Sequence, residues 1–206
     1  MIPGRDPIAS TAVVSETAVL AAGVSVGHFA LIDPDGGGGT RIGKGTSVGP
    51  HVLIEDDVEI GANCVVDAFC RICAGTRIAD GAKILYGVAV FDDVSIGRDC
   101  IIGGNVADRT VIEDYVTYFG EIAHTYRVPG DLAAWDGPPQ PSPTIRTRAV
   151  VGQNALLIGG IEIGEGAYVA AGEIVRGNVP AEQMFVRGRL RAISQLRGVV
   201  QARSDD

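Results

Sequence analysis

The sequence has few aromatic residues, no long apolar run and no leader-like start. Phe, Trp and Tyr make up 5% of its 206 residues, so a core built from large rings is not expected. No apolar stretch approaches the roughly 18 residues that a membrane span requires. The opening MIPGRDPIAS has no basic stretch followed by an apolar core, which a secretory signal would have. We therefore expect a soluble, cytoplasmic protein with no membrane partner.

Positive charge is also scarce. The chain has 17 Lys and Arg residues against 25 Asp and Glu, a formal net charge of −8. Proteins that bind nucleic acid need a basic face to displace the counterions of the phosphates. The charge balance therefore argues against nucleic acid as a partner.

What the sequence does have is an aliphatic residue at every sixth position. A period of six fits neither the 3.6 residues of a helical turn nor the alternation of an antiparallel strand. It fits short strands with a corner every six residues, so that three hexads form one triangular coil and the aliphatic residues stack inside. The series contains only Ile, Leu and Val, in three runs: Ile8, Val14, Leu20, Val26, Ile32; then Ile42, Val48, Ile54, Ile60, Val66, Ile72, Ile78, Ile84, Val90, Ile96, Ile102; then Val151, Leu157, Ile163, Val169, Val175.

Several hexads resemble those of the hexapeptide-repeat acyltransferases, namely IGKGTS (42–47), IEDDVE (54–59), IGANCV (60–65) and IGEGAY (163–168). The resemblance covers most of residues 8–126 and 145–180. It implies an all-β fold, a left-handed parallel β-helix, over residues 1–180. Residues 181–206 are expected to form a short strand or turn and then a helix that caps the open end of the stack, because an uncapped edge is a template for unwanted pairing.

The hexad register is interrupted three times. The Gly36–Gly39 run lengthens one corner, and Ile102 is followed by a ten-residue step. The series then resumes at Ile112, Tyr118 and His124. Residues 127–148 contain half of the prolines of the chain, and proline removes donors from a strand ladder. We therefore predict that this segment is a loop extruded from one corner.

Three of the four cysteines fall at inward positions of the hexads. Cys70 and Cys73 form a CxxC pair, which in other proteins indicates redox or zinc chemistry. In the hexad frame, however, Cys64, Cys70 and Cys100 are expected to be small apolar fillers of a narrow interior. Cys73 begins a corner, and no metal site is predicted there. No disulfide framework is implied, in agreement with a reducing compartment.

His124 is the candidate catalytic residue. It lies in FGEIAHTYR, at the end of a coil and just before the predicted loop. This position resembles that of the catalytic histidine of hexapeptide acyltransferases. An imidazole suits the removal of a proton from an amine or hydroxyl near pH 7. Glu121 or Asn105 could orient the ring, and the sequence does not choose between them. The alternative is a surface or interface histidine satisfied by hydrogen bonds.

A basic C-terminal region is the candidate site for acetyl-CoA. Between positions 176 and 197 there are five arginines and one acid, and arginine offers paired donors to phosphate. Residues 159–189 are also similar to the ending of hexapeptide acetyltransferases, in which small residues let the pantetheine lie along an edge of the prism. The cofactor-binding candidates are Gly160, Ala171, Gly172, Arg176, Arg187 and Arg189. The substrate-binding candidates, in and beside the loop, are Tyr126, Arg127 and Trp135.

The resemblance implies a coenzyme A-dependent acyltransferase that acetylates an amine or hydroxyl of a small polar acceptor such as a sugar or sugar nucleotide. It also implies a homotrimer with sites between the prisms. One alternative is a non-catalytic scaffold or binding subunit. Another is a zinc enzyme similar to the γ-class carbonic anhydrases. Those enzymes use three histidines, two of them a few residues apart, whereas His28, His51 and His124 are separated by wide gaps.

Overall fold

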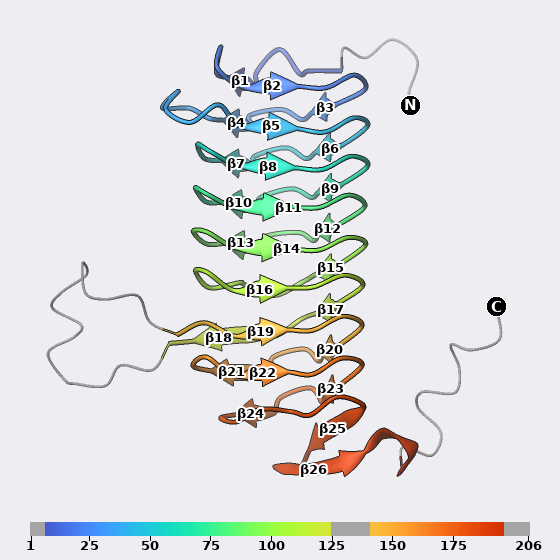
Figure 1. Cartoon of the computed structure of the whole chain (residues 1–206). Helices are drawn as coiled ribbons and strands as arrows, with labels where there is room; N and C mark the ends of the chain where they lie inside the picture. Colours follow the sequence, from blue (N-terminus) through green and yellow to red (C-terminus); the bar gives the residue numbers. More distant parts are fainter. Residues whose placement is uncertain (1–6, 125–140, 196–206) are drawn as a thin grey trace, which may run out of the picture.

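Each hexad forms one short strand and one corner in the computed structural model, which describes residues 7–124 and 141–195. Successive coils stack into a straight column with three faces (Figure 1). Strands of neighbouring coils pair in parallel, and of the strands in the described residues only the last two, β25 and β26, pair antiparallel. The expected all-β fold, a left-handed parallel β-helix of hexapeptide repeats, is confirmed.

Three stacks of strands form the faces. The first face contains β1 (Val13–Val14), β4 (Leu31–Ile32), β7 (Leu53–Ile54), β10 (Arg71–Ile72) and β13 (Ala89–Val90), and it continues in β18 (Glu121–Ala123), β21 (Leu156–Ile158) and β24 (Ile174–Val175). The second contains β2 (Val19–Leu20), β5 (Arg41–Ile42), β8 (Glu59–Ile60), β11 (Arg77–Ile78), β14 (Ser95–Ile96), β16 (Val111–Ile112), β19 (Thr144–Ile145) and β22 (Glu162–Ile163). The third contains β3 (Ser25–Val26), β6 (Ser47–Val48), β9 (Val65–Val66), β12 (Lys83–Ile84), β15 (Ile101–Ile102), β17 (Thr117–Tyr118), β20 (Val150–Val151), β23 (Tyr168–Val169), β25 (Gln183–Val186) and β26 (Arg189–Ala192).

The corners take the names of the faces they join. The first corner lies between the first and second faces, the second corner between the second and third, and the third corner between the third and first. Many corner residues have positive φ, for example Asn63 and Gly81, and this left-handed conformation suits Asn, Asp and Gly. The corners therefore explain the abundance of glycine in the sequence.

The aliphatic residues of the hexads fill the interior of the column, as predicted. All of them are buried except Ile8, Val14 and Leu20, which belong to the first coil and have no coil above them in the described chain. Cys64, Cys70 and Cys100 are also buried among them. Their predicted role as small interior fillers is confirmed.

Most paired strands are 18 residues apart, as in Arg71↔Ala89, but the coil that contains the corner after Ile102 is shorter. Ile101 pairs with Thr117, a separation of 16, and Val106 forms an isolated bridge with Val90. The ten-residue step after Ile102 is thus a four-residue corner followed by a normal hexad, with Val106 as an inward residue that the sequence analysis missed. Gly104 and Gly120 make the short corner possible, because their backbones are in direct contact: a Cβ on Gly104 would overlap the carbonyl oxygen of Gly120.

The coil resumes at β19 after the predicted loop. Thr144 and Ile145 pair with β16 on one side and with β22 on the other. The extruded segment therefore ends before Thr144, whereas the sequence predicted that it extends to Arg148. Most of the predicted loop lies outside the described residues.

The C-terminal end of the column is covered by a hairpin. β25 extends the third face by pairing with β23, and β26 folds back on β25. A short 3-10 turn, η2 (Ile193–Gln195), follows. The expected strand is therefore present, and the residues in which the capping helix is predicted, beyond Gln195, lie outside the described residues. In the described part of the chain, no helix is long and apolar enough to cross a membrane.

Candidate active site

His124 follows the last residue of β18, at the first corner. The strand is held in place by its pairing with β21, and the carbonyl of Ala123 accepts a hydrogen bond of 2.9 Å from the amide of Gly159. The side chain of His124 is 16% exposed, so the ring is largely covered but retains access to solvent.

His124 does not occupy the inward position that a regular six-residue step from Tyr118 would give it. Ile122 pairs with Leu157 and packs against the core instead. The step from Tyr118 to Ile122 is four residues long, because the chain makes a tight corner at Gly120, where a Cβ would lie 2.8 Å from the carbonyl oxygen of Ala155. This second short corner moves His124 out of the interior and onto the first corner of the column.

An acidic side chain lies beside the ring of His124. The Nε2 atom is 3.9 Å from a carboxylate oxygen of Asp108, which is 16 residues earlier and at the same corner of the preceding coil. The Nδ1 atom is buried and has no hydrogen-bond partner within the described residues. Asp108 is itself anchored, because the hydroxyl of Ser142 donates a hydrogen bond to its main-chain carbonyl. Catalytic hydrogen bonds are often long before substrate binds, so this separation is compatible with an acid–base pair.

Glu121 and Asn105, the two candidates for orienting His124, contact each other. The amide nitrogen of Asn105 donates to the carboxylate of Glu121 at 3.3 Å, and its amide oxygen accepts from the main-chain N–H of Ala89 at 2.9 Å. In the described chain, the titratable neighbour of the ring is Asp108, which the sequence analysis missed. The signal that could have found it is the length of the shortened coil, 16 residues.

The six cofactor-binding candidates separate into two groups. Gly160 and Arg176 follow β21 and β24 at the first corner, the corner that also carries His124. Gly160 is in close contact with the returning chain, since a Cβ there would lie 2.6 Å from the Cβ of Pro141. Arg176 is exposed.

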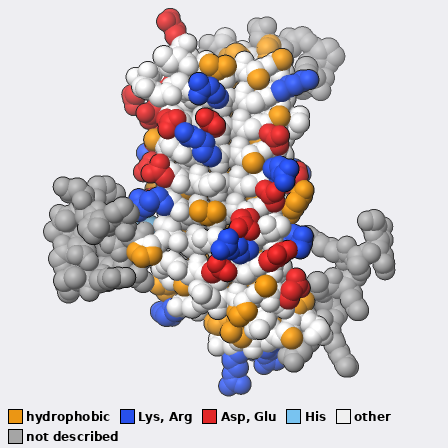
Figure 2. All heavy atoms as spheres, viewed as in Figure 1, with side chains coloured by type: hydrophobic (Ala, Val, Ile, Leu, Met, Phe, Trp, Pro, Cys, Tyr) orange, Lys and Arg blue, Asp and Glu red, His pale blue; other side chains and the backbone are white. Residues whose placement is uncertain are grey.

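The other four candidates lie at the third corner and the C-terminal hairpin: Ala171, Gly172, Arg187 and Arg189. The main-chain amides of Arg187 and Gly188 donate to the carboxylate of Glu173 at 2.6 and 3.0 Å, which fixes the hairpin turn next to this corner. The side chains of Arg187 and Arg189 are exposed, and basic side chains, which are all arginines here, project from this end of the column (Figure 2).

The remaining predicted residues, Tyr126, Arg127 and Trp135, lie outside the described residues.

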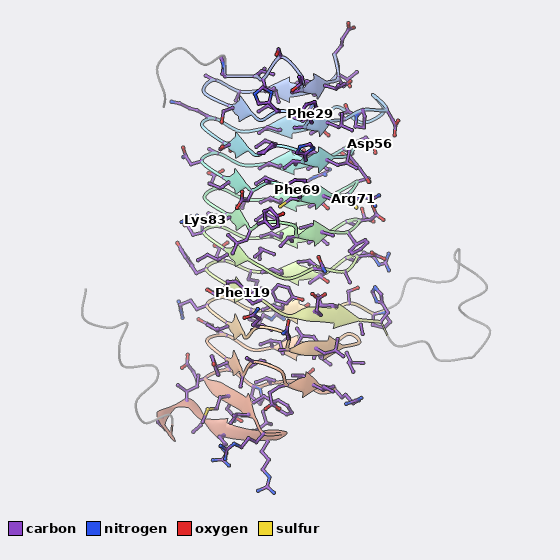
Figure 3. The ribbon with its side chains drawn as sticks, turned by 180° about the vertical axis from the view of Figure 1, so that it is seen from behind. Phe29, Asp56, Phe69, Arg71, Lys83 and Phe119 are labelled. Atoms are coloured by element: carbon purple, nitrogen blue, oxygen red, sulfur yellow. The ribbon has the colours of Figure 1, made fainter. Side chains whose placement is uncertain are left out.

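The other two histidines are at the third corner. His51 stacks between Phe29 and Phe69, with ring centroids 5.1 and 4.9 Å apart, and the two phenylalanines are labelled along one edge in Figure 3. His28 pairs through Nδ1 with the hydroxyl of Thr11 at 2.9 Å. Within one chain, the three histidines are therefore divided between two corners.

Comparisons with known proteins agree with the repeat pattern. Residues 39–74 match the family described as bacterial transferase hexapeptide (six repeats). The serine acetyltransferase of Buchnera aphidicola subsp. Acyrthosiphon pisum is 43% identical over 54 residues, 26% of this chain and 20% of that protein. The bifunctional protein GlmU of a Nostoc species is 29% identical over 185 residues, 88% of this chain and 33% of that protein. The chain thus spans a third or less of the length of these curated relatives.

The solved structures extend the likeness to the fold. The UDP-N-acetylglucosamine O-acyltransferase (LpxA) of Moraxella catarrhalis RH4 superposes with a TM-score of 0.60 at 18% identity, covering 91% of this chain and 74% of that one. The stacked hexads and the three-faced column make this chain a β-helix of hexapeptide repeats, and part of it, residues 39–74, is similar to the bacterial transferase hexapeptide family.

Proposed function

We propose that the protein is a coenzyme A-dependent acyltransferase in which His124 is the general base. The observation that carries the proposal is the ring of His124, largely covered at a corner of a transferase-type β-helix, with Nε2 beside the carboxylate of Asp108. The match to a protein named serine acetyltransferase supports acetyl as the group transferred. The acceptor is an amine or hydroxyl of a small polar molecule, with a sugar or sugar nucleotide as the leading candidate.

In the proposed reaction, neutral His124 accepts the proton of the acceptor as its nitrogen or oxygen attacks the thioester carbonyl. The carboxylate of Asp108 stabilises the imidazolium that forms. A bond from the acceptor to the acyl carbon forms, the carbon–sulfur bond breaks, and the proton passes from His124 to the departing thiolate of coenzyme A. No acyl-enzyme is required. A main-chain N–H near the site supplies the donor that stabilises the oxyanion.

The division of the cofactor-binding candidates favours a site shared between chains. Gly160 and Arg176 can serve the same site as His124, because all three lie at the first corner. Ala171, Gly172, Arg187 and Arg189 lie at a different corner and would reach an acyl-CoA bound to His124 from a neighbouring chain. The exposed guanidinium groups of Arg187 and Arg189 suit the phosphates of coenzyme A. We therefore expect a homotrimer with one site at each interface, and a monomer in analytical ultracentrifugation would contradict this arrangement.

Thiol release from acetyl-CoA in the presence of amino-sugar and sugar-nucleotide acceptors tests the reaction. A general base typically contributes about 10²–10⁴-fold, so His124→Ala is expected to lower kcat by that factor. His28→Ala is the matched control, since that imidazole is exposed at the third corner and is expected to leave kcat unchanged.

Calorimetry separates chemistry from binding. Acetyl-CoA is expected to bind once per chain, to the wild type and to His124→Ala alike. The proposal fails if the wild type binds no acetyl-CoA up to about millimolar concentration, because any binding free energy would then be weaker than about −4 kcal/mol. It also fails if His124→Ala turns over at the wild-type rate. Absence of both binding and turnover would favour the non-catalytic scaffold.

A further inference from the structure

Three consecutive coils each contribute one metal-ligating side chain to the first corner. Glu55 follows β7, Cys73 follows β10, and Asp92 lies in the turn after β13. The sulfur of Cys73 and a carboxylate oxygen from each of the two acids all lie within 4.8 Å of one another. Figure 3 shows Arg71, which leads into this corner, on the side of the column where β18 ends. The cluster is assembled by the stacking of coils and is not visible as a sequence motif.

Cys73 differs from the other cysteines of the chain. Cys64, Cys70 and Cys100 each donate a hydrogen bond to a main-chain carbonyl, at 3.2, 3.0 and 3.0 Å. Cys73 is 3% exposed, and the described structure records no such bond for it. Its sulfur instead faces the two carboxylates. Burial, together with the charge of Glu55, raises the pKa of the Cys73 thiol to about 11.

Negative charge at the cluster is incompletely balanced. Arg71 donates to one oxygen of Glu55 at 2.6 and 2.9 Å, and the main-chain amide of Ala74 donates to the other oxygen at 3.2 Å. Asp92 is exposed and has no ion pair among the described residues. A cation bound between Cys73 and Asp92 would relieve the repulsion between the carboxylates of Glu55 and Asp92.

We propose that Glu55, Cys73 and Asp92 form a binding site for one thiophilic divalent cation, with zinc as the natural occupant. One thiolate and two carboxylates leave the fourth tetrahedral position to water. With bonds of about 2.3 Å to sulfur and 2.0 Å to oxygen, tetrahedral donor atoms stand roughly 3.5 Å apart, so side-chain rotation alone can close the cluster. The thiol proton is released as the metal–sulfur bond forms.

The remaining contacts of the cluster suit such a site. Ligating carboxylates are usually oriented by hydrogen bonds from outside the ligand set, and Arg71 and Ala74 provide these for Glu55. The amide of Cys73 is fixed by a 2.8 Å bond to the carbonyl of Val90, so the backbone that carries the sulfur is already ordered. A bound ion would link three coils of the column that are otherwise held by two-residue strands.

Titration of the metal-free full-length protein with Cd²⁺ tests the proposal, because a cadmium–thiolate bond produces a charge-transfer band in the ultraviolet. One band-forming equivalent per chain is expected, with displacement by Zn²⁺ but not by a hundredfold excess of Mg²⁺. Cys73→Ser is expected to abolish the band. Asp92→Asn is expected to weaken Cd²⁺ binding at least about tenfold, and its exposed position makes misfolding no concern.

Asp93→Asn is the matched control, since it removes the same charge one residue away and keeps a residue that tolerates the positive φ of that position. Its Cd²⁺ affinity is expected to stay within about twofold of wild type, a change near 0.4 kcal/mol. The proposal is overturned if the wild type gives no thiolate band, if the band persists in Cys73→Ser, or if Asp92→Asn and Asp93→Asn weaken binding equally.

Discussion

The hydroxyl of Tyr118 offers a test of how the shortened coils are held together. Tyr118 is the largest side chain of the interior and is 0% exposed, in a column otherwise built from Ile, Leu, Val and smaller residues. Its hydroxyl donates to the main-chain carbonyl of Asn105 at 3.0 Å, across the four-residue corner that follows Ile102. The substitution Tyr118→Phe removes this bond and leaves the ring in place.

The expected cost is about 1 kcal/mol of unfolding free energy. A net intramolecular hydrogen bond contributes about 0.5–1.5 kcal/mol, whereas a fully buried acceptor left without a donor costs about 1–3 kcal/mol. Asn105 is exposed, so water can replace the lost donor at its carbonyl and the lower range applies. Burial also raises the pKa of Tyr118 well above its usual value, so the hydroxyl remains a donor throughout the neutral and alkaline range in which the fold persists.

Urea unfolding followed by circular dichroism measures the difference, provided that the transition midpoint shifts and the slope does not. Tyr115→Phe is the control, because Tyr115 is 53% exposed at a corner and its hydroxyl is expected to contribute less than about 0.5 kcal/mol. Equal stability of Tyr118→Phe and wild type, or an equal loss in Tyr115→Phe, would refute the reasoning.

Two further predictions concern the contacts between coils. Gly43→Ala is expected to destabilise the fold by about 1–3 kcal/mol in urea unfolding, because the added Cβ would lie 2.6 Å from the main-chain nitrogen of Ala62. The control is Gly177→Ala, which has open space around the new Cβ and is expected to change stability by less than about 0.5 kcal/mol. Equal losses of stability in the two variants would contradict the packing argument. The hydrogen bond from Arg146 lowers the pKa of Glu113 below 4.5, so the stability that this carboxylate contributes is present above that pH and is lost as the pH falls below it. Glu113→Gln is therefore expected to be less stable at pH 7 and to lose less stability on acidification, and parallel stability–pH curves for the two proteins would contradict this.

The sequence alone predicted the fold because the interior of the column has one repeating requirement. In the regular coils, the inward residue of each strand is aliphatic and stacks on the one 18 residues away, so the period is visible in the residues themselves. It also predicted a break in the coils near the proline-rich segment, since prolines and a broken register are local features, although the coil resumes at Thr144, before the predicted end at Arg148. The positions of Cys64, Cys70 and Cys100 followed from the same frame, and all three are buried as expected.

The shortened coils could not be resolved in this way. A ten-residue step from Ile102 is compatible with either corner being the short one, and only the close approach of Gly104 to Gly120 decides it. The same kind of corner at Gly120 turns Ile122 inward and places His124 outside the core. Backbone packing between coils, which the sequence does not display, makes these choices.

Contacts around the corners were likewise decided by the tertiary structure. Asp108 lies beside His124 because one coil is 16 residues long, and Cys73 meets Glu55 and Asp92 because three coils of normal length are stacked in register. The sequence determined the repeat, since burial acts on each hexad in the same way. The neighbours of each corner residue depend on the summed lengths of the intervening turns, so a change of two residues exchanges one neighbour for another.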